Sequence, residues 1–340
     1  MNKPRIDWLD AVKGASILMV SMYHVGLIMD AYGYSIIWLM KINALLTPIR
    51  MPVFFLAAGF VARSSVNRPW LYLFEKRIGF YAYLFVLWSV LRFSFFGNVV
   101  PNRLAPLEGN DWTWLISSLV APETGAWFLW ALAIFYSLTK SVESVPARVV
   151  IPIGILASVI GFSGIVPMLF SFANILQYFV FFYVACHFQH LILRLSEMPA
   201  RLIALGTPVF AVLTVLAWRS SYWWIDGPAE LAAAVAGVLA LIGIAVRLEN
   251  SLLGSVARFF GHNTLPIYVM HLTIISSVAH MAAQYNLPDH AASRLFLVVV
   301  LFLAAVVLPV VIKRFFDRIG LSFFLFRLPW SGAARKPVVV

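Results

Sequence analysis

Runs of apolar residues long enough to cross a lipid bilayer recur along almost the whole chain, and they limit the possible folds more than any other feature. A helix needs about 20 apolar residues to cross the hydrocarbon core of a membrane. Hydrophobic residues make up 62% of the 340 residues and charged residues only 11%, whereas a soluble domain carries about 25% charged residues. The sequence therefore excludes a water-soluble globular protein and predicts an all-α, polytopic membrane protein.

The apolar runs predict about ten transmembrane helices joined by short loops. The expected spans lie at roughly 11–31, 45–62, 78–97, 126–140, 149–167, 169–188, 202–218, 229–246, 263–282 and 294–312.

The distribution of basic residues predicts the orientation of these spans, because Lys and Arg accumulate in short cytoplasmic loops. With the N-terminus inside, most of the 25 basic residues fall on the cytoplasmic side, and the exceptions are Lys41, Arg50, Arg92, Arg103, Arg219 and Arg294. Ten spans return the chain to the same side, so we expect both termini in the cytoplasm. The net charge of +11 is thus explained by the membrane, and no nucleic-acid partner is expected.

No repeat, low-complexity stretch or linker divides the chain, so we expect one transmembrane domain over residues 1–314. The remaining residues, 315–340, form a tail that we expect to lie on the inner leaflet as an amphipathic cytoplasmic segment. This expectation depends on the alternation of basic residues with Phe323, Phe324, Phe326 and Trp330.

The first span carries ionisable residues on one face. Lys13 and His24 are eleven residues apart, and at 100° per residue they return to within about 20° of each other. Asp10 lies about 40° to the other side of His24 by the same arithmetic. One helix face therefore carries an acid and a base near the cytoplasmic edge and a histidine roughly 16 Å deeper, at about 1.5 Å per residue.

His24 is the strongest candidate for a catalytic residue in this set. Ionisable residues are costly in hydrocarbon and usually line a cavity. A histidine has an ordinary pKa of about 6.5, which suits a general base. The alternative is that His24 only hydrogen-bonds to a neighbouring helix.

Basic residues also gather between the second and third spans. A cationic collar at the inner mouth of the bundle would be formed by Arg63, Arg68, Lys76 and Arg77, and such groups bind phosphate. The tendency of cytoplasmic loops to be basic explains the same residues without any ligand.

Fewer residues are candidates for an acceptor cavity. His271 is the deepest ionisable residue of the ninth span, and Asn263 begins that span. Trp127 begins the fourth span, where it belongs either to an interfacial aromatic belt or, with Glu123 beside it, to a site that stacks on a sugar ring. With Arg50, these residues are the candidates for an acceptor cavity. His187 and His190 lack further ligands, so no metal site is predicted.

Four segments, in order, resemble the acyltransferase family 3 membrane proteins, especially the branch of fucose O-acetylase-like and exopolysaccharide O-acetyltransferases. In RIDWLDAVKGASILMVSMYHV, Lys13 and His24 match the family's basic residue and histidine. MPVFFLAAGF at 51–60 is similar to M-P-x-F-F-x-x-S-G-F, with Ala58 in place of the serine. WFLWALAIFY at 127–136 and GHNTLPIYVMH at 261–271 resemble two later motifs.

One departure from the family concerns the expected donor site. Many members have R-x-x-R at the start of the third span, whereas here Arg77 is followed by Phe80 at that spacing. Lys76 or Arg68 would have to replace the missing arginine. The first span has Lys13 where many members have arginine, and an ammonium group contacts a phosphate as a point charge without the bidentate fork.

The resemblance implies a multi-pass enzyme of the bacterial inner membrane. It would transfer an acyl group, usually acetyl from acetyl-CoA as co-substrate, to a hydroxyl of a glycan or lipid-linked sugar, without a permanently bound cofactor. Lys13, Arg77, Lys76 and Arg68 would bind acyl-CoA, His24 would act as general base and Asp10 would orient Lys13. The oxyanion donor is left open between His271 and Asn263. A transporter of a glycan precursor or an organic acid is the alternative, although no inverted repeat is visible.

Overall fold

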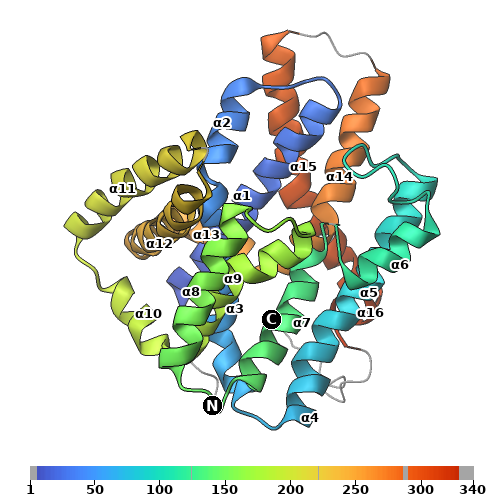
Figure 1. The fold of residues 1–340 in the computed structure, drawn as a ribbon. Coiled ribbons are helices and arrows are strands. Elements are labelled where there is room, and N and C mark those ends of the chain that lie inside the picture. The colour runs from blue at the N-terminus through green and yellow to red at the C-terminus, as the bar shows by residue number, and fades with distance from the viewer. Residues whose placement is uncertain (1–5, 124, 221, 286–289, 329–340) are drawn as a thin grey trace.

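A computed structural model describes residues 6–123, 125–220, 222–285 and 290–328 of this protein. Within these residues the secondary structure is entirely helical, so the predicted all-α fold is confirmed (Figure 1). The elements are α1 (Asp7–Ala31), α2 (Ile37–Leu45), α3 (Thr47–Val66), α4 (Trp70–Leu73), the π-helical turn η1 (Phe74–Ile78), α5 (Gly79–Asn98), α6 (Trp112–Val120), α7 (Trp127–Ser141), α8 (Ala147–Ser163), α9 (Phe170–His187), α10 (Gln189–Ser196), α11 (Ala200–Arg219), α12 (Trp223–Arg247), α13 (Leu252–His262), α14 (Thr264–Gln284), α15 (Ala291–Arg318) and α16 (Ser322–Phe326).

Seven helical segments in the described part of the chain are long and apolar enough to cross a membrane. They are α1, α3, the continuous stretch Trp70–Asn98, α9, α12, α14 and α15. The other three predicted spans coincide with α7, α8 and α11. The protein is therefore a multi-pass membrane protein, whereas the count of ten crossings and the cytoplasmic position of both termini stay predictions.

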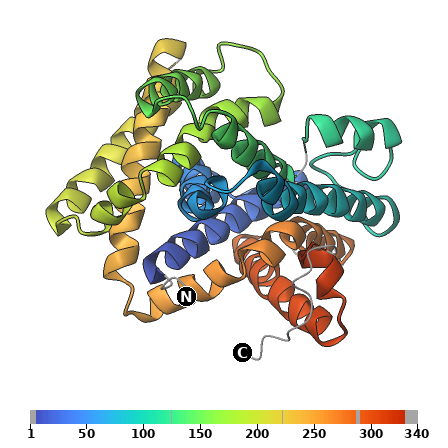
Figure 2. The same ribbon diagram turned by 90° about the horizontal axis from the view of Figure 1, so that it is seen from below.

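Helix α1 lies at the centre of the bundle, where it contacts α3, α12, α13, α14 and α15 (Figure 2). Two glycines bring α1 and α13 into backbone contact. A Cβ atom at Gly14 would lie 1.8 Å from the carbonyl oxygen of Ala257, and one at Gly261 would lie 1.9 Å from that of Asp10. Only glycine allows this approach, which fixes the end of α13 and the start of α14 beside the N-terminal part of α1.

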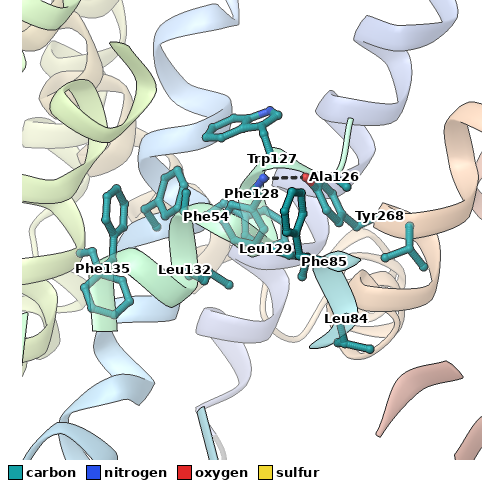
Figure 3. Close-up of a cluster of buried hydrophobic side chains, with 14 of the residues drawn as sticks. Phe54, Leu84, Phe85, Ala126, Trp127, Phe128, Leu129, Leu132, Phe135 and Tyr268 are labelled. Carbon is teal, nitrogen blue, oxygen red and sulfur yellow. Dashed lines mark hydrogen bonds between the residues drawn. The ribbon is translucent and has the colours of Figure 1, made fainter. Parts of the chain in front are cut away.

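Helix α7 begins inside the bundle. Ala126, Trp127 and Phe128, at its start, are 2%, 9% and 4% exposed. The backbone N–H of Phe128 donates to the hydroxyl of Tyr268 on α14 (Figure 3). The start of α7 is thus buried within the protein, whereas its position at the outer interface stays a prediction.

Aromatic side chains hold the start of α7 in place. The ring of Phe55 on α3 lies 5.9 Å from that of Trp127, 4.7 Å from that of Phe128 and 5.4 Å from that of Tyr178 on α9, measured between ring centroids. Figure 3 shows Phe54 and Phe85 in the same cluster, which joins α3, α5, α7 and α14. Trp127 therefore packs in a core and is not part of an interfacial belt.

Helix α15 passes the expected domain boundary at residue 314 and ends at Arg318. After it, α16 packs against α5, where Trp88 Nε1 donates to the carbonyl of Leu325 at 3.0 Å and the Tyr83 hydroxyl donates to that of Phe324 at 2.8 Å. The position of the tail on the inner leaflet stays a prediction. Its last part, residues 329–340 with Trp330, lies outside the described residues.

Candidate active site

The structure brings together the two deep histidines of the predicted site. His24 Nδ1 on α1 lies 3.1 Å from His271 Nε2 on α14, and the two ring centroids are 4.9 Å apart. His271 is fully buried, and His24 is half-buried. The histidines are 247 positions apart in the sequence and become a pair only because α14 runs alongside α1.

Hydrogen bonds to backbone carbonyls define the tautomers of this pair. His271 Nδ1 lies 3.0 Å from the carbonyl oxygen of Ile267 and 2.8 Å from that of Tyr268, so it must carry the hydrogen. His24 Nδ1 likewise lies 2.9 Å from the carbonyl oxygen of Val20. His24 therefore donates from Nδ1, and His271 Nε2 accepts. The second nitrogen of His24, Nε2, keeps its lone pair and has no partner in the described part of the chain.

A cavity of about 180 Å³ lies against His24. We call it the outer cavity, after the predicted orientation of the chain. Its lining includes Tyr23 on α1, Trp127 on α7, Leu272 on α14 and the exposed Glu123 from the loop before α7. Of the predicted acceptor residues, Glu123 and Trp127 thus line one cavity together with His24.

A buried ion pair forms one wall of the outer cavity. Arg92 on α5 contacts Glu108 through two hydrogen bonds, Nε to Oε1 at 3.0 Å and Nη2 to Oε2 at 2.9 Å. The side chains are 3% and 1% exposed. Asn102 donates a third bond to Glu108 Oε2 at 2.5 Å, and its own side-chain oxygen accepts from two backbone N–H groups of the loop. This network gives the loop between α5 and α6 a fixed shape.

A second cavity, of about 210 Å³, approaches the histidine pair from the opposite end of the bundle. We call it the inner cavity. Lys13 on α1 lines it, together with Ala58 on α3, Tyr81 on α5, and Phe128 and Tyr268 at the junction of α7 and α14. The two cavities flank the first turn of α7, where Trp127 lines the outer cavity and Phe128 the inner one.

Asp10 connects Lys13 on its own helix, α1, to α13. Its Oδ1 lies 2.5 Å from Lys13 Nζ, and its Oδ2 lies 3.0 Å from Nε2 of His262 at the end of α13. Asp10 is buried, and Lys13 is 25% exposed. The carboxylate therefore positions Lys13 at the inner cavity and lies far from His24 along α1.

Of the remaining basic residues of the predicted donor site, Lys76 and Arg77 lie in the π-helical turn η1, and Arg68 lies in the loop between α3 and α4. Arg77 is half-buried, and its Nε donates to the Ser65 hydroxyl on α3 at 2.9 Å. Tyr81, which lines the inner cavity, lies within electrostatic reach of the Arg77 guanidinium. Lys76 and Arg68 are exposed at the same end of the bundle. A π-turn widens a helix locally and often marks a functional site.

Three predicted acceptor residues, His271, Asn263 and Arg50, do not line the outer cavity. Asn263 lies at the start of α14, at the inner end of the bundle, and its amide donates to the carbonyl of Phe259 at 2.8 Å. Arg50 is buried behind Tyr23, with its guanidinium carbon 4.0 Å from the centre of that ring, and donates to Thr47 Oγ1 at 2.7 Å. Its Nη1 has no hydrogen-bond partner in the described part of the chain.

Several residues of the site were not predicted. Three hydrogen bonds between separate segments of the chain were not expected: His262 with Asp10, Arg92 with Glu108, and the backbone of α7 with Tyr268. For Arg92, the sequence did indicate that a partner must exist, because a charged residue within a span needs one. The sequence offered no way to choose that partner.

The comparisons with known proteins identify the family of the chain. The chain matches the model of acyltransferase family 3, described as an acyltransferase domain, over residues 6–314. The match runs from the start of the described chain into α15 and includes both histidines and both cavities. The comparisons with curated proteins and with solved structures gave no match. Because the family model covers nearly the whole chain, this protein belongs to acyltransferase family 3.

Proposed function

We propose that this acyltransferase moves an acetyl group from cytoplasmic acetyl-CoA to a hydroxyl of a glycan or a lipid-linked sugar at the bacterial inner membrane. The observation that carries the proposal is the position of His24. It pairs with His271 where two cavities approach each other from opposite ends of the bundle. A donor and an acceptor on opposite sides of a membrane need such an arrangement.

The inner cavity suits the donor. Acyl-CoA is a polyanion, so its phosphates would rest at the inner mouth against Lys13 and Arg77, with the exposed Lys76 and Arg68 nearby. Most of the cavity lining is apolar, which suits an uncharged pantetheine arm that leads to the thioester. The missing second arginine of R-x-x-R would then be compensated by these neighbouring ammonium and guanidinium groups.

The outer cavity suits the acceptor. Trp127 and Tyr23 offer aromatic surface to a sugar ring, and Glu123 offers a carboxylate to its hydroxyl groups. An acceptor hydroxyl in this cavity would lie within reach of His24 Nε2. This nitrogen would take the proton as the hydroxyl oxygen attacks the thioester carbonyl carbon, a contribution worth about 10²–10⁴-fold in rate.

His271 would act as the positioning residue for this base. By accepting from His24 Nδ1, it keeps the lone pair on Nε2 and supports the charge that His24 gains during the reaction. The same logic orients the histidine of a catalytic triad, where a third group fixes the tautomer.

Two variants of His271 separate this role from simple packing. In His271→Gln, a side-chain oxygen can replace Nε2 and still accept from His24. In His271→Asn, the amide can replace Nδ1 and bond to the carbonyls of Ile267 or Tyr268, but the side chain is too short to reach His24. We expect His271→Asn to lower kcat about tenfold, the value of one neutral hydrogen bond, and His271→Gln to retain more activity. Wild-type kcat in His271→Asn would contradict the role.

Removing the charge of Lys13 tests the donor site. Lys13→Met keeps the aliphatic stem, and we expect it to raise KM for acetyl-CoA about 10–100-fold, because a hydrogen bond to a charged group is worth about 1.5–3 kcal/mol. KM for the acceptor should not change. Arg148→Met is the matched control, since Arg148 is an exposed basic residue at the start of α8 that lines neither cavity. Equal rises in both KM values for Lys13→Met would argue against a phosphate contact.

The proposed function is tested with purified wild-type protein in nanodiscs. Radiolabelled acetyl-CoA and candidate glycan acceptors are added, and both CoA thiol release and label on the glycan are counted. We expect thiol release that depends on the acceptor and an equal amount of label on the glycan. No release with several acyl donors from a folded protein would overturn the proposal in favour of a transporter, for which uptake into vesicles is the assay.

A further inference from the structure

The hydroxyl group of Tyr268 lies at a point where several features of the fold meet. Its oxygen accepts a hydrogen bond of 2.9 Å from the backbone N–H of Phe128, in the first turn of α7. The side chain of Tyr268 is 7% exposed and reaches from α14 to the start of α7 (Figure 3). This contact therefore joins two helices that approach each other inside the bundle.

The hydroxyl keeps its own hydrogen for another partner. A phenol oxygen can accept and donate at the same time, and within the described residues its only recorded hydrogen bond is the one from Phe128. The N-terminus of the 15-residue helix α7 carries a partial positive charge. Because this charged end donates to the oxygen, it polarises the O–H group and strengthens it as a donor.

Tyr268 also lines the donor cavity and neighbours the histidine pair. Tyr268 and Phe128 both line the inner cavity. Tyr268 precedes His271 by three residues on α14, its ring centroid is 6.1 Å from that of His271, and its backbone carbonyl accepts from His271 Nδ1. A thioester that enters the inner cavity would therefore meet this hydroxyl close to the histidine pair.

The two groups expected from the sequence as oxyanion donors are already occupied. His271 directs its only N–H group at the carbonyls of Ile267 and Tyr268. Asn263 donates to the carbonyl of Phe259. Neither can donate to a substrate without breaking these bonds, whereas Tyr268 can do so without losing its contact to Phe128.

We infer, on the basis of the proposed function, that Tyr268 is a further catalytic residue, whose hydroxyl donates to the thioester carbonyl oxygen of the acyl donor. The acceptor oxygen gives its proton to His24 Nε2 and forms a bond to the carbonyl carbon. The carbonyl electron pair moves to the oxygen, and Tyr268 stabilises the resulting negative charge. The C–S bond then breaks, the carbonyl re-forms, and the CoA thiolate takes the proton from His24. The products are an ester and free CoA.

Tyr268→Phe tests this role, because it removes the hydroxyl and keeps the ring. Removal of one oxyanion donor typically lowers kcat about 10²–10³-fold, and we expect a loss of this size. The dissociation constant for a non-cleavable acyl-CoA analogue, in which a methylene replaces the sulfur, should stay at the wild-type value. Tyr183→Phe is the matched control, since Tyr183 is an equally buried tyrosine on α9 that lines neither cavity, and it should keep wild-type kcat.

A fluorinated tyrosine at position 268 separates a catalytic from a structural role. Fluorination makes the phenol more acidic but leaves its size nearly unchanged. If the O–H group must donate, kcat should be retained near neutral pH and should fall at a lower alkaline pH than in the wild type. A residue that only caps α7 would leave the pH profile unmoved.

The outcomes distinguish this inference from the proposed function. A wild-type protein that transfers no acyl group from any thioester defeats the proposed function, and the inference falls with it. A wild-type protein that transfers acetyl, while Tyr268→Phe keeps its kcat, overturns the inference alone. If Tyr268→Phe lowers the melting temperature and the affinity for the analogue along with kcat, its role is structural, and the inference is also overturned.

Discussion

Replacing His24 by alanine is expected to lower kcat for acetyl transfer by about 10²–10⁴-fold, because the reaction loses its general base. His24 Nε2 is the nitrogen that the tautomer leaves free, and it belongs to a residue that lines the outer cavity. The affinity for acetyl-CoA should change little, since the proposed phosphate contacts lie at the other end of α1. Label transfer to the glycan and CoA thiol release, measured in parallel, check this expectation.

The control for His24→Ala is another membrane-embedded histidine. His280, on the same helix as His271, lies 3.4 Å from the Tyr32 hydroxyl and 3.1 Å from the Gln284 amide and lines neither cavity. His280→Ala should transfer acetyl at nearly the wild-type rate. Full activity in His24→Ala would exclude His24 as the base, and equal losses in both variants would point to damage to the bundle.

Replacing Glu108 by alanine is expected to destabilise the protein by about 3–5 kcal/mol, because it leaves Arg92 as an unpaired charge in the interior. The guanidinium of Arg92 is 3% exposed and directs two hydrogen bonds at Glu108. Asn102 would lose its acceptor in the same step. Unfolding of the detergent-solubilised protein by heat or denaturant measures the loss.

Two further variants decide whether the buried charge causes this effect. Glu123→Ala removes an exposed carboxylate of the same cavity, and it should leave the melting temperature unchanged while raising KM for the acceptor. Arg92→Met combined with Glu108→Leu removes both charges and should restore much of the stability that Glu108→Ala loses. A double variant as unstable as Glu108→Ala would show that the loop packing, and not the charge, is responsible.

The sequence predicted the helical class, the membrane environment and the locations of the long helices, because these depend on local composition. Ten predicted spans overlap ten helices of the structure, and helical periodicity correctly placed Asp10 and Lys13 next to each other on α1. Contacts within one helix follow from its geometry alone, since residues three or four apart share a face.

Local pattern could not reveal where α7 begins. Its sequence is apolar and aromatic from Trp127 onward, which suggests an ordinary span that starts at the interface. The start is buried because the rings of Phe55 and Tyr178 pack against Trp127 and the Tyr268 hydroxyl accepts from the backbone N–H of Phe128. Such cover depends on how the helices are arranged.

The sequence alone therefore determined which polar residues were candidates for function, because ionisable groups in apolar spans are energetically costly and easy to recognise. Lys13, His24 and His271 are among these candidates. Tertiary structure alone decided which of them meet. The approach of α14 to α1, permitted by Gly14 and Gly261 at the neighbouring contact with α13, turned two isolated histidines into a pair. The same packing of helices brought the hydroxyl of Tyr268 to the backbone N–H of Phe128 in the first turn of α7. Hydrogen-bond geometry between residues more than a hundred positions apart is set by helix packing, which no single stretch of sequence encodes.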